Sequence, residues 1–380
     1  MIILDKPYIS KEMKEFLQES QACVLDNPQA QKESQGYSLH LAPSEELVSR
    51  FQEGERLYTA SENSLSWVTD NLKSPDLLRS VHMMKDKAEF RRILQALYPD
   101  FYFQAVPTHQ LDQINPDLLP LPVILKPAVG FFSLGVYTIQ TTDDWRNALQ
   151  TIYQQAEKWS AEFSSSVVNH TSFLIEQYIA GEEYALDVYF DEQGHAVILN
   201  IMKHDFSSAE DVSDRLYYTS REIVLSHIRA FEDYLNNVNA IIQARNFPAH
   251  VEIRVDQGRI YPIEFNPLRF AGWCCTDITY FAFGFKTYDY YLNNRRPDWD
   301  HLLAGKEHKI YTLIALNKPE NFDNKKEFDY NGLCEHFQKV LCVRKVDHRQ
   351  FSAFGFLFTE TQDQRELDYI VRCDLGAFAK

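Results

Sequence analysis

The chain has 380 residues, of which 45% are hydrophobic and 14% aromatic, so it is long and apolar enough for two or three folded domains. Its formal net charge of −16 opposes nonspecific attraction to nucleic acid and to anionic membranes. We therefore expect small-molecule partners, with no nucleic acid and no membrane.

The cysteines and the N-terminus bear on the cellular compartment. The six cysteines show neither CxxC spacing nor a dense disulfide framework, which favours reduced thiols. The N-terminus has no basic start followed by an apolar signal core, and no stretch approaches the roughly 18 apolar residues that span a bilayer. These patterns predict a cytoplasmic protein.

Residues 1–80 predict a small N-terminal α/β domain. Short apolar runs and amphipathic segments alternate as strand, helix, strand, strand and helix, at residues 2–4, 11–18, 22–25, 56–59 and 65–72. Between them, residues 26–55 are polar and poorly periodic. The pattern indicates no function for this domain.

A helix is predicted within HMMKDKAEFRRILQALYPD, because Phe90, Ile93, Leu94 and Leu97 are spaced for one helix face. Lys87 lies in the first turn of this helix. A lysine there is usually solvated, but it can also reach a phosphate.

A strand, a glycine-containing loop and a second strand are predicted next. Lys126 lies at the end of the first strand, and Gly130, Ser133 and Gly135 lie in the loop. Glycines let backbone N–H groups approach a phosphate closely, and the lysine adds positive charge. The segment is not the G-x-x-x-x-G-K-[ST] phosphate loop, and an ordinary hairpin would also explain its glycines.

Two acids follow in the next strands. Glu176 lies near the end of an apolar strand, and Glu183 follows shortly after Gly181. Each is either a rim carboxylate or part of an adenosine pocket, in which the backbone of residues 176–179 meets the adenine edge and a carboxylate accepts the ribose hydroxyls. The predicted elements of this region are a helix, three strands, a mobile polar loop and an amphipathic helix, at residues 142–159, 173–178, 184–190, 196–201, 203–220 and 221–245.

The segment HVEIRVDQGRIYPIEFNPLRF predicts a β-hairpin around Asp256-Gln257-Gly258. With a three-residue loop, Glu252, Arg254, Glu264 and Asn266 share one face of the hairpin, whereas a two-residue turn places the two glutamates on opposite faces. Two carboxylates and an amide oxygen suit Mg²⁺, which prefers oxygen ligands. The alternative is a solvated hairpin, but the acid in the apolar strand IEFNP needs a reason to be buried.

The remaining residues predict a core segment and a C-terminal α/β lobe. Residues 271–291 are aromatic with helical spacing, which is more typical of a core than of a cofactor site. Strand, helix, strand, strand and helix follow, the first four at residues 311–316, 332–339, 340–345 and 352–358.

The order of these motifs resembles the ATP-grasp superfamily of carboxylate–amine and carboxylate–thiol ligases. The resemblance rests on DKAEF, VILKPAVGFFSLGV, IEQYIAGEEY and HVEIRV…IYPIEFNP, over about 180 residues. It implies α/β and α+β domains: an N-terminal α/β domain over residues 1–80, an ATP-grasp domain over 81–300 with ATP between two subdomains, and a C-terminal α/β lobe over 301–380.

The resemblance also implies roles for individual residues. Lys87 and Lys126 contact ATP phosphates, and the loop of Gly130, Ser133 and Gly135 closes over them. The adenosine is held by Glu176, Gln177, Tyr178, Ile179 and Glu183, and Mg²⁺, or Mn²⁺ in its place, by Glu252, Glu264 and Asn266. The basic candidates near the acyl group are Arg254, Arg269 and Lys203, although relatives place the arginine one position earlier, where this chain has Leu268.

The implied reaction is an ADP-forming ligation, in which MgATP activates a carboxylate as an acyl phosphate for attack by an amine. The substrates would be a small amino acid or peptide-like acid and an amine, and the resemblance is compatible with a homodimer. Two alternatives stay open. The chain could modify a protein or peptide terminus, or it could bind nucleotide as a regulatory or scaffolding protein without turnover.

Overall fold

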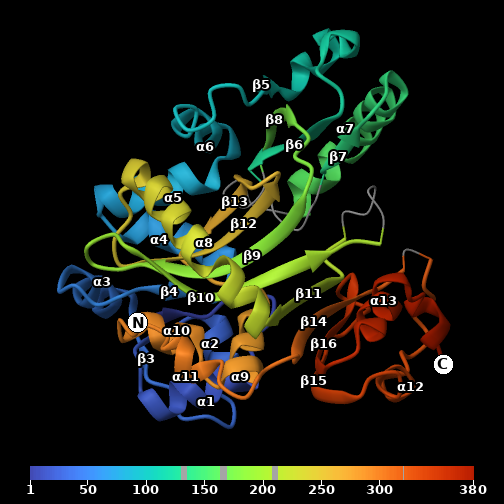
Figure 1. The fold of residues 1–380 in the computed structure, drawn as a ribbon. Helices are drawn as coiled ribbons and strands as arrows, with labels where there is room; N and C mark the ends of the chain where they lie inside the picture. The colour runs from blue at the N-terminus through green and yellow to red at the C-terminus, as the bar shows by residue number, and fades with distance from the viewer. Residues whose placement is uncertain (130–134, 163–168, 208–212, 320) are drawn as a thin grey trace.

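The computed structural model describes residues 1–380 except 130–134, 163–168, 208–212 and 320 (Figure 1). It contains three sheets. The N-terminal sheet is parallel, in the order β3-β2-β1-β4. Its strands are β1 (Ile2–Ile3), β2 (Val24–Leu25), β3 (Leu41–Ala42) and β4 (Tyr58–Thr59), with helices α1 (Lys11–Ser20), α2 (Pro28–Glu33), α3 (Ser44–Gln52) and α4 (Leu65–Asn71).

Two helices then lead to the second sheet. Helix α5 (Pro75–Lys85) ends at Asp86, whose side chain caps α6 (Lys87–Ile93) by accepting from the N–H groups of Ala88 and Glu89. The lysine that opens α6 is therefore fixed at a capped helix start.

The second sheet is small and antiparallel, in the order β5-β8-β6-β7. Its strands are β5 (Phe103–Pro107), β6 (Val123–Val129), β7 (Tyr137–Ile139) and β8 (Asn169–Gln177). Helix α7 (Thr142–Glu162) covers one face through Trp145 and Ile152. The other face carries Ala128 and Leu174 against Ala88 of α6, so it is turned toward the rest of the molecule.

The third sheet has eight antiparallel strands in the order β13-β12-β9-β10-β11-β14-β16-β15. They are β9 (Glu182–Phe190), β10 (Ala196–Asp205), β11 (Leu216–Ser220), β12 (Phe247–Asp256), β13 (Arg259–Pro267), β14 (Ile310–Asn317), β15 (Lys339–Lys345) and β16 (Ala353–Thr361). Helix α8 (Arg221–Ile242) packs on one face through Phe231, Leu235 and Val238. The remaining helices are α9 (Ile278–Phe283), α10 (Thr287–Leu292), α11 (Trp299–Leu302), α12 (Tyr330–Cys334) and α13 (Gln364–Arg372).

The mixed α/β class predicted from the sequence is confirmed, with several local corrections. Residues 26–55 contain α2, β3 and α3, because elements this short leave little periodicity to detect. Residues 203–220 are not one mobile loop: β10 continues to Asp205 and β11 pairs with β14, while 208–212 lie outside the described residues. Helix α12 ends at Cys334 and not at 339 as predicted, because residues 335–338 form a turn that leads into β15.

The large sheet also joins parts that the sequence treats separately. Strands β14, β15 and β16 continue the sheet begun by β9 to β13, so the C-terminal lobe shares a sheet with the hairpin (Figure 1). The domain boundaries at 80 and 300 stay predictions. Among the described helices, none combines the length and apolarity that crossing a bilayer requires.

Candidate functional site

In the hairpin of β12 and β13, a β-bulge brings the two glutamates to the same face. The predicted three-residue loop is not present. The turn has two residues, Gln257 and Gly258, at φ 50° and 80°, with Asp256 paired to Arg259. Left-handed conformations at both positions match the twist of the strands. Ile253 pairs with Pro262 while Glu252 pairs with Glu264, so one extra residue on β13 restores the common face. The predicted three-residue loop is therefore wrong, because the bulge supplies the same change in register.

The two glutamates consequently face each other directly across the strands. Asn266 Nδ2 donates to Glu264 Oε1 at 2.9 Å, and Lys87 Nζ lies 2.7 Å from Glu264 Oε2. Burial and the charge of Glu264 raise the pKa of Glu252 to about 7. Burial acts to lower the pKa of Lys87, but the charge of Glu264 raises it above its usual value. We call Glu252, Glu264 and Asn266 the carboxylate face.

Two residues beside the carboxylate face, on the same side of the sheet, were missed from the sequence. His250 Nδ1 lies 2.8 Å from Asp187 Oδ1, and His250 Nε2 lies 3.6 Å from Glu252 Oε1. Asp187 also accepts from Thr276 Oγ1 at 2.6 Å and from the Ala271 N–H at 2.9 Å. Burial alone would lower the pKa of His250, but hydrogen bonds to Asp187 and Glu252 raise it to about 9. The signal was available, since His250 alternates with Glu252 and Asp187 interrupts the apolar run YALDVYF.

The small sheet presents a second buried cluster. Glu176 accepts from Arg91 Nε at 2.7 Å, and Lys126 Nζ lies 2.6 Å from its other oxygen. Burial would raise the pKa of Glu176, but the charges of Arg91 and Lys126 lower it to about 2. Arg91 Nη1 also donates to the Pro262 carbonyl of β13 at 2.7 Å, so this arginine joins the two sheets.

Arg254 lies on the same face of β12 as Glu252, but its contacts are with Glu183 and Ile179 and not with the carboxylate face. Its Nε donates to Glu183 Oε2 at 2.8 Å and its Nη1 to the Ile179 carbonyl at 2.6 Å, while the guanidinium lies over the Tyr178 ring. His204 Nδ1 lies 2.9 Å from the other oxygen of Glu183. Arg254 therefore joins Glu183 to the strand connection at 178–181, where the adenosine segment was predicted.

Arg269 approaches the carboxylate face through an unusual turn. Leu268 has φ 61°, a rare conformation for a residue with a branched side chain, and its carbonyl accepts from the Thr59 N–H at 2.8 Å. Arg269 then pairs with Glu62, which also pairs with Lys85. Burial acts to lower the pKa of Arg269, but the charges of Glu62, Glu264 and Glu252 raise it. Arg269, which lies one position later than the arginine of the relatives, therefore interacts electrostatically with both Glu252 and Glu264.

Comparison with known proteins identifies the fold. A family model described as an ATP-grasp domain matches residues 119–277. The chain carries an ATP-grasp domain. No curated protein matches the sequence.

Solved structures agree with the ATP-grasp assignment. An L-amino acid ligase from Bacillus licheniformis is 17% identical at a TM-score of 0.66, over 100% of this chain and 97% of that one. An N5-carboxyaminoimidazole synthetase from Staphylococcus aureus, complexed with ADP, is 14% identical at a TM-score of 0.65, over 97% of this chain and 95% of that one. A biotin carboxylase complex with β-γ-ATP from Campylobacter jejuni is 11% identical at a TM-score of 0.61, over 97% of this chain and 89% of that one. At these identities the likeness establishes the ATP-grasp fold.

The ATP-grasp framework brings most of the predicted residues to the inner faces of two sheets, but not Lys203. This lysine pairs in register with Tyr184, whose ring packs on Phe231 of α8, and its Nζ lies 2.5 Å from Glu182. Because β10 alternates its side chains, Lys203 lies on the α8 face while His204 lies on the inner face. We therefore correct the prediction and no longer regard Lys203 as a candidate.

Other predicted positions are only partly described. Gly130 and Ser133 lie outside the described residues, whereas Gly135 has φ 74° after the loop. Gln177 and Tyr178 donate their N–H groups to the carbonyls of Tyr102 and Pro122. These bonds fix the backbone of the segment predicted to face adenine.

The carboxylate face fits a divalent cation that also binds a nucleotide. Among the described residues, no three His, Cys, Asp or Glu side chains form a metal cluster. The face offers two opposed carboxylates and an amide, which is too few ligands to enclose Mg²⁺ without other oxygens. Mg²⁺ commonly takes one or two carboxylates and completes its shell with phosphates and water. Burial and the charge of Glu264 raise the pKa of Glu252, and a bound cation would favour the ionised form of this acid.

Proposed function

We propose that the protein is an ADP-forming ligase that uses MgATP to join a small carboxylic acid to an amine. The observation that carries the proposal is the opposition of Glu252 and Glu264, with Asn266 and Lys87 beside them. The ATP-grasp fold of the chain supports the same activity. The substrates proposed are an amino acid or peptide-like acid and an amine.

In the proposed reaction, an oxygen of the substrate carboxylate attacks the γ-phosphorus of ATP and ADP leaves. The amine then attacks the acyl carbon, the phosphate leaves, and the amine nitrogen loses a proton. Lys87 and Lys126 would hold the phosphates, since an ammonium has three donors and can bind a phosphate as well as a carboxylate. Glu252, Glu264 and Asn266 would hold Mg²⁺, which neutralises phosphate charge when bound.

Arg269 is the best basic candidate for the acyl group. It is buried, and its charge interacts with both acids of the carboxylate face. Glu62 and Lys85 fix its position from the N-terminal part of the chain. Arg254 contacts Glu183 and Ile179, so we assign it to the adenosine side with Tyr178.

The adenosine assignments remain part of the proposal. The backbone of residues 176–179 would bind adenine, and Glu183 would accept the ribose hydroxyls. The side chain of Glu176 is already bound by Arg91 and Lys126, so its proposed role is to position Lys126. Glu183 is oriented for a ribose by Arg254 and His204.

The proposal is tested by measuring ADP release with MgATP over a panel of acids crossed with amines. We expect release only when both an acid and an amine are present. Lys126→Ala should raise the ATP concentration needed for half-maximal turnover, whereas Lys11→Ala, on an exposed helix position, should not. A normal ATP titration of Lys126→Ala would remove this lysine from the phosphate site.

Binding of MgATP without ADP release across the panel would favour the alternative of a regulatory or scaffolding protein. Release that requires a peptide or protein terminus would favour the other alternative. The cytoplasmic location, Mn²⁺ as a substitute and a homodimer are further expectations of the proposal.

A further inference from the structure

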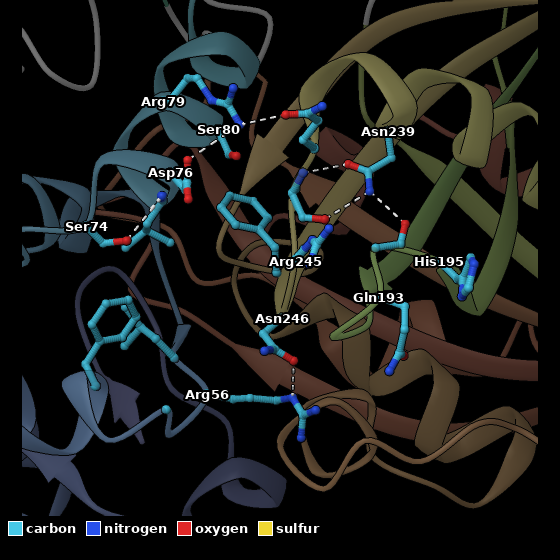
Figure 2. A pocket seen from close by; sticks show the side chains of 18 of the residues that line it. Arg56, Ser74, Asp76, Arg79, Ser80, Gln193, His195, Asn239, Arg245 and Asn246 are labelled. Carbon is cyan, nitrogen blue, oxygen red and sulfur yellow. Dashed lines mark hydrogen bonds and ion pairs between the residues drawn. The ribbon is translucent and has the colours of Figure 1, made fainter.

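A cavity of about 610 Å³ lies at the C-terminal end of α8, next to α5 and the β9–β10 turn (Figure 2). Its walls come from three parts of the chain: the α3–β4 connection with the first half of α5, the β9–β10 turn, and the end of α8 with residues 243–247. None of its lining residues belongs to the site described above. Its volume is in the range of pockets that bind small molecules.

The lining is about equally polar and apolar and contains three arginines. Figure 2 shows Arg79 on α5, Arg245 after α8 and Arg56 before β4 among the side chains that line the cavity. Arg56 Nε donates to Asn246 Oδ1 at 3.0 Å, and Arg79 Nη2 lies 3.5 Å from the Ile242 carbonyl. In the part of the chain that the structure describes, Arg56 and Arg245 have no carboxylate within ion-pair distance.

The acids of the lining do not balance these arginines. Glu55 lies 2.8 Å from the N-terminal ammonium and 3.3 Å from Arg50, so its charge is already compensated. Asp76 is 91% exposed and lies 3.8 Å from Arg79, which is a weak, screened contact. On a chain with net charge −16, this cavity is therefore a local concentration of positive charge.

The neighbouring amides and carbonyls define what else the cavity can bind. The Asn239 amide is bound to the backbone of Gly194 and Ala244, whereas the end of α8, with Ala240 and Gln243, lies in the lining. A helix C-terminus disfavours a bare anion but accepts hydrogen bonds from hydroxyl or amino groups. Guanidinium groups bind carboxylate and phosphate oxygens in pairs. The lining thus matches an oxyanion attached to a hydrogen-bonding body.

We propose that this cavity is a second ligand site, which binds a small metabolite carrying a carboxylate or phosphate group together with hydroxyl or amino groups. The oxyanion binds to arginines of this lining, and the hydroxyl or amino groups face the end of α8. Helix α5 begins at this cavity and ends at Lys85, which pairs with Glu62 next to Arg269. A ligand here contacts the same helix that positions the proposed acyl site.

The test uses pyrophosphate and citrate as probes for the two oxyanion types, titrated by calorimetry without Mg²⁺. Ionic strength is kept on the order of 0.01 M, where screening extends over about 30 Å. The variants are Arg245→Gln and Arg79→Gln, whose side chains have no strong partner to lose. Each is expected to weaken binding roughly tenfold, because each removes a charge-assisted hydrogen bond.

Two controls separate this site from the proposed phosphate site and from surface charge. Lys126→Ala removes the proposed ATP-phosphate contact and should leave binding of at least one probe intact. Arg349→Gln removes an exposed arginine elsewhere and should change nothing. The stronger probe indicates whether the natural oxyanion is a phosphate or a carboxylate. Absence of saturable binding by both probes, or unchanged binding in both arginine variants, would overturn the proposal whether or not the protein is a ligase.

Discussion

The two acidic clusters on the facing sheets differ in how completely their charge is compensated. Glu176 on the small sheet has two cations at hydrogen-bond distance, and its pKa is lowered to about 2. Glu252 on the large sheet faces another carboxylate, and its pKa is raised to about 7. A compensated cluster can hold structure by itself, whereas opposed carboxylates are costly unless a cation joins them. From this comparison we propose that Glu176 positions Lys126 and that the opposed carboxylates bind a cation.

Arg91→Ala should have the largest effect, because it leaves buried Glu176 with one cation and removes the bond to Pro262 that joins the sheets. Breaking a buried ion pair costs about 3–5 kcal/mol. We expect a large fall in the midpoint of urea denaturation. Arg92→Ala, at the exposed neighbouring position, should change it little. Equal midpoints for the two variants would show that the small-sheet cluster is not structural.

Glu264→Gln should lower turnover most among the face variants. It removes the charge that pairs with Lys87 and one proposed Mg²⁺ ligand. We expect kcat/KM for ATP to fall roughly 100-fold, as for other groups that stabilise developing charge. The matched control is Glu327→Gln, an exposed glutamate. Unchanged ADP release by Glu264→Gln would refute the metal assignment.

Glu252→Gln should change how the stability of the protein depends on pH. Burial and the charge of Glu264 raise the pKa of Glu252 from 4.5 to about 7, so the folded state holds a proton that the unfolded state loses. Wild-type stability from this group is present below pH 4.5 and is lost as the pH rises to about 7. Without metal, Glu252→Gln should therefore melt higher than the wild type at pH 8 and show no such advantage at pH 4.5.

Glu264→Gln is the matched opposite in the same experiment. Burial opposes ionisation of Glu264, but Lys87 lowers its pKa, so this acid stabilises the folded state above its ordinary pKa. It should melt lower than the wild type at pH 8. A constant difference between wild type and Glu252→Gln across this pH range would contradict the charge imbalance on which the comparison rests.

Local sequence rules predicted part of the carboxylate face. Alternation along a strand places Glu252 and Arg254 on one face, whereas Glu264 joins them through a bulge and not through the predicted three-residue loop. The ATP-grasp fold itself followed from the order of the motifs, and the structural comparisons confirm it.

Contacts between residues far apart in the chain could not be predicted from the sequence. The bulge at Ile263 and the left-handed Leu268 have no glycine to mark them, and each changes where the next side chain lies. Arg91 reads as an ordinary helical arginine until the fold brings Glu176 and Pro262 to it. Such positions are set by how two sheets pack, which no short spacing records.

Lys203→Ala should have the smallest effect, and it tests the division between the two faces of the large sheet. Lys203 and His204 are neighbours, yet Lys203 pairs with exposed Glu182 while His204 contacts buried Glu183. Exposed pairs contribute about 0–1 kcal/mol, so ADP release by Lys203→Ala should stay within about twofold of the wild type. His204→Ala leaves Glu183 without one of its two partners, and KM for ATP should rise about tenfold. If instead turnover falls in Lys203→Ala and persists in His204→Ala, the catalytic face is the α8 side, and the assignment of the carboxylate face to ATP cannot hold.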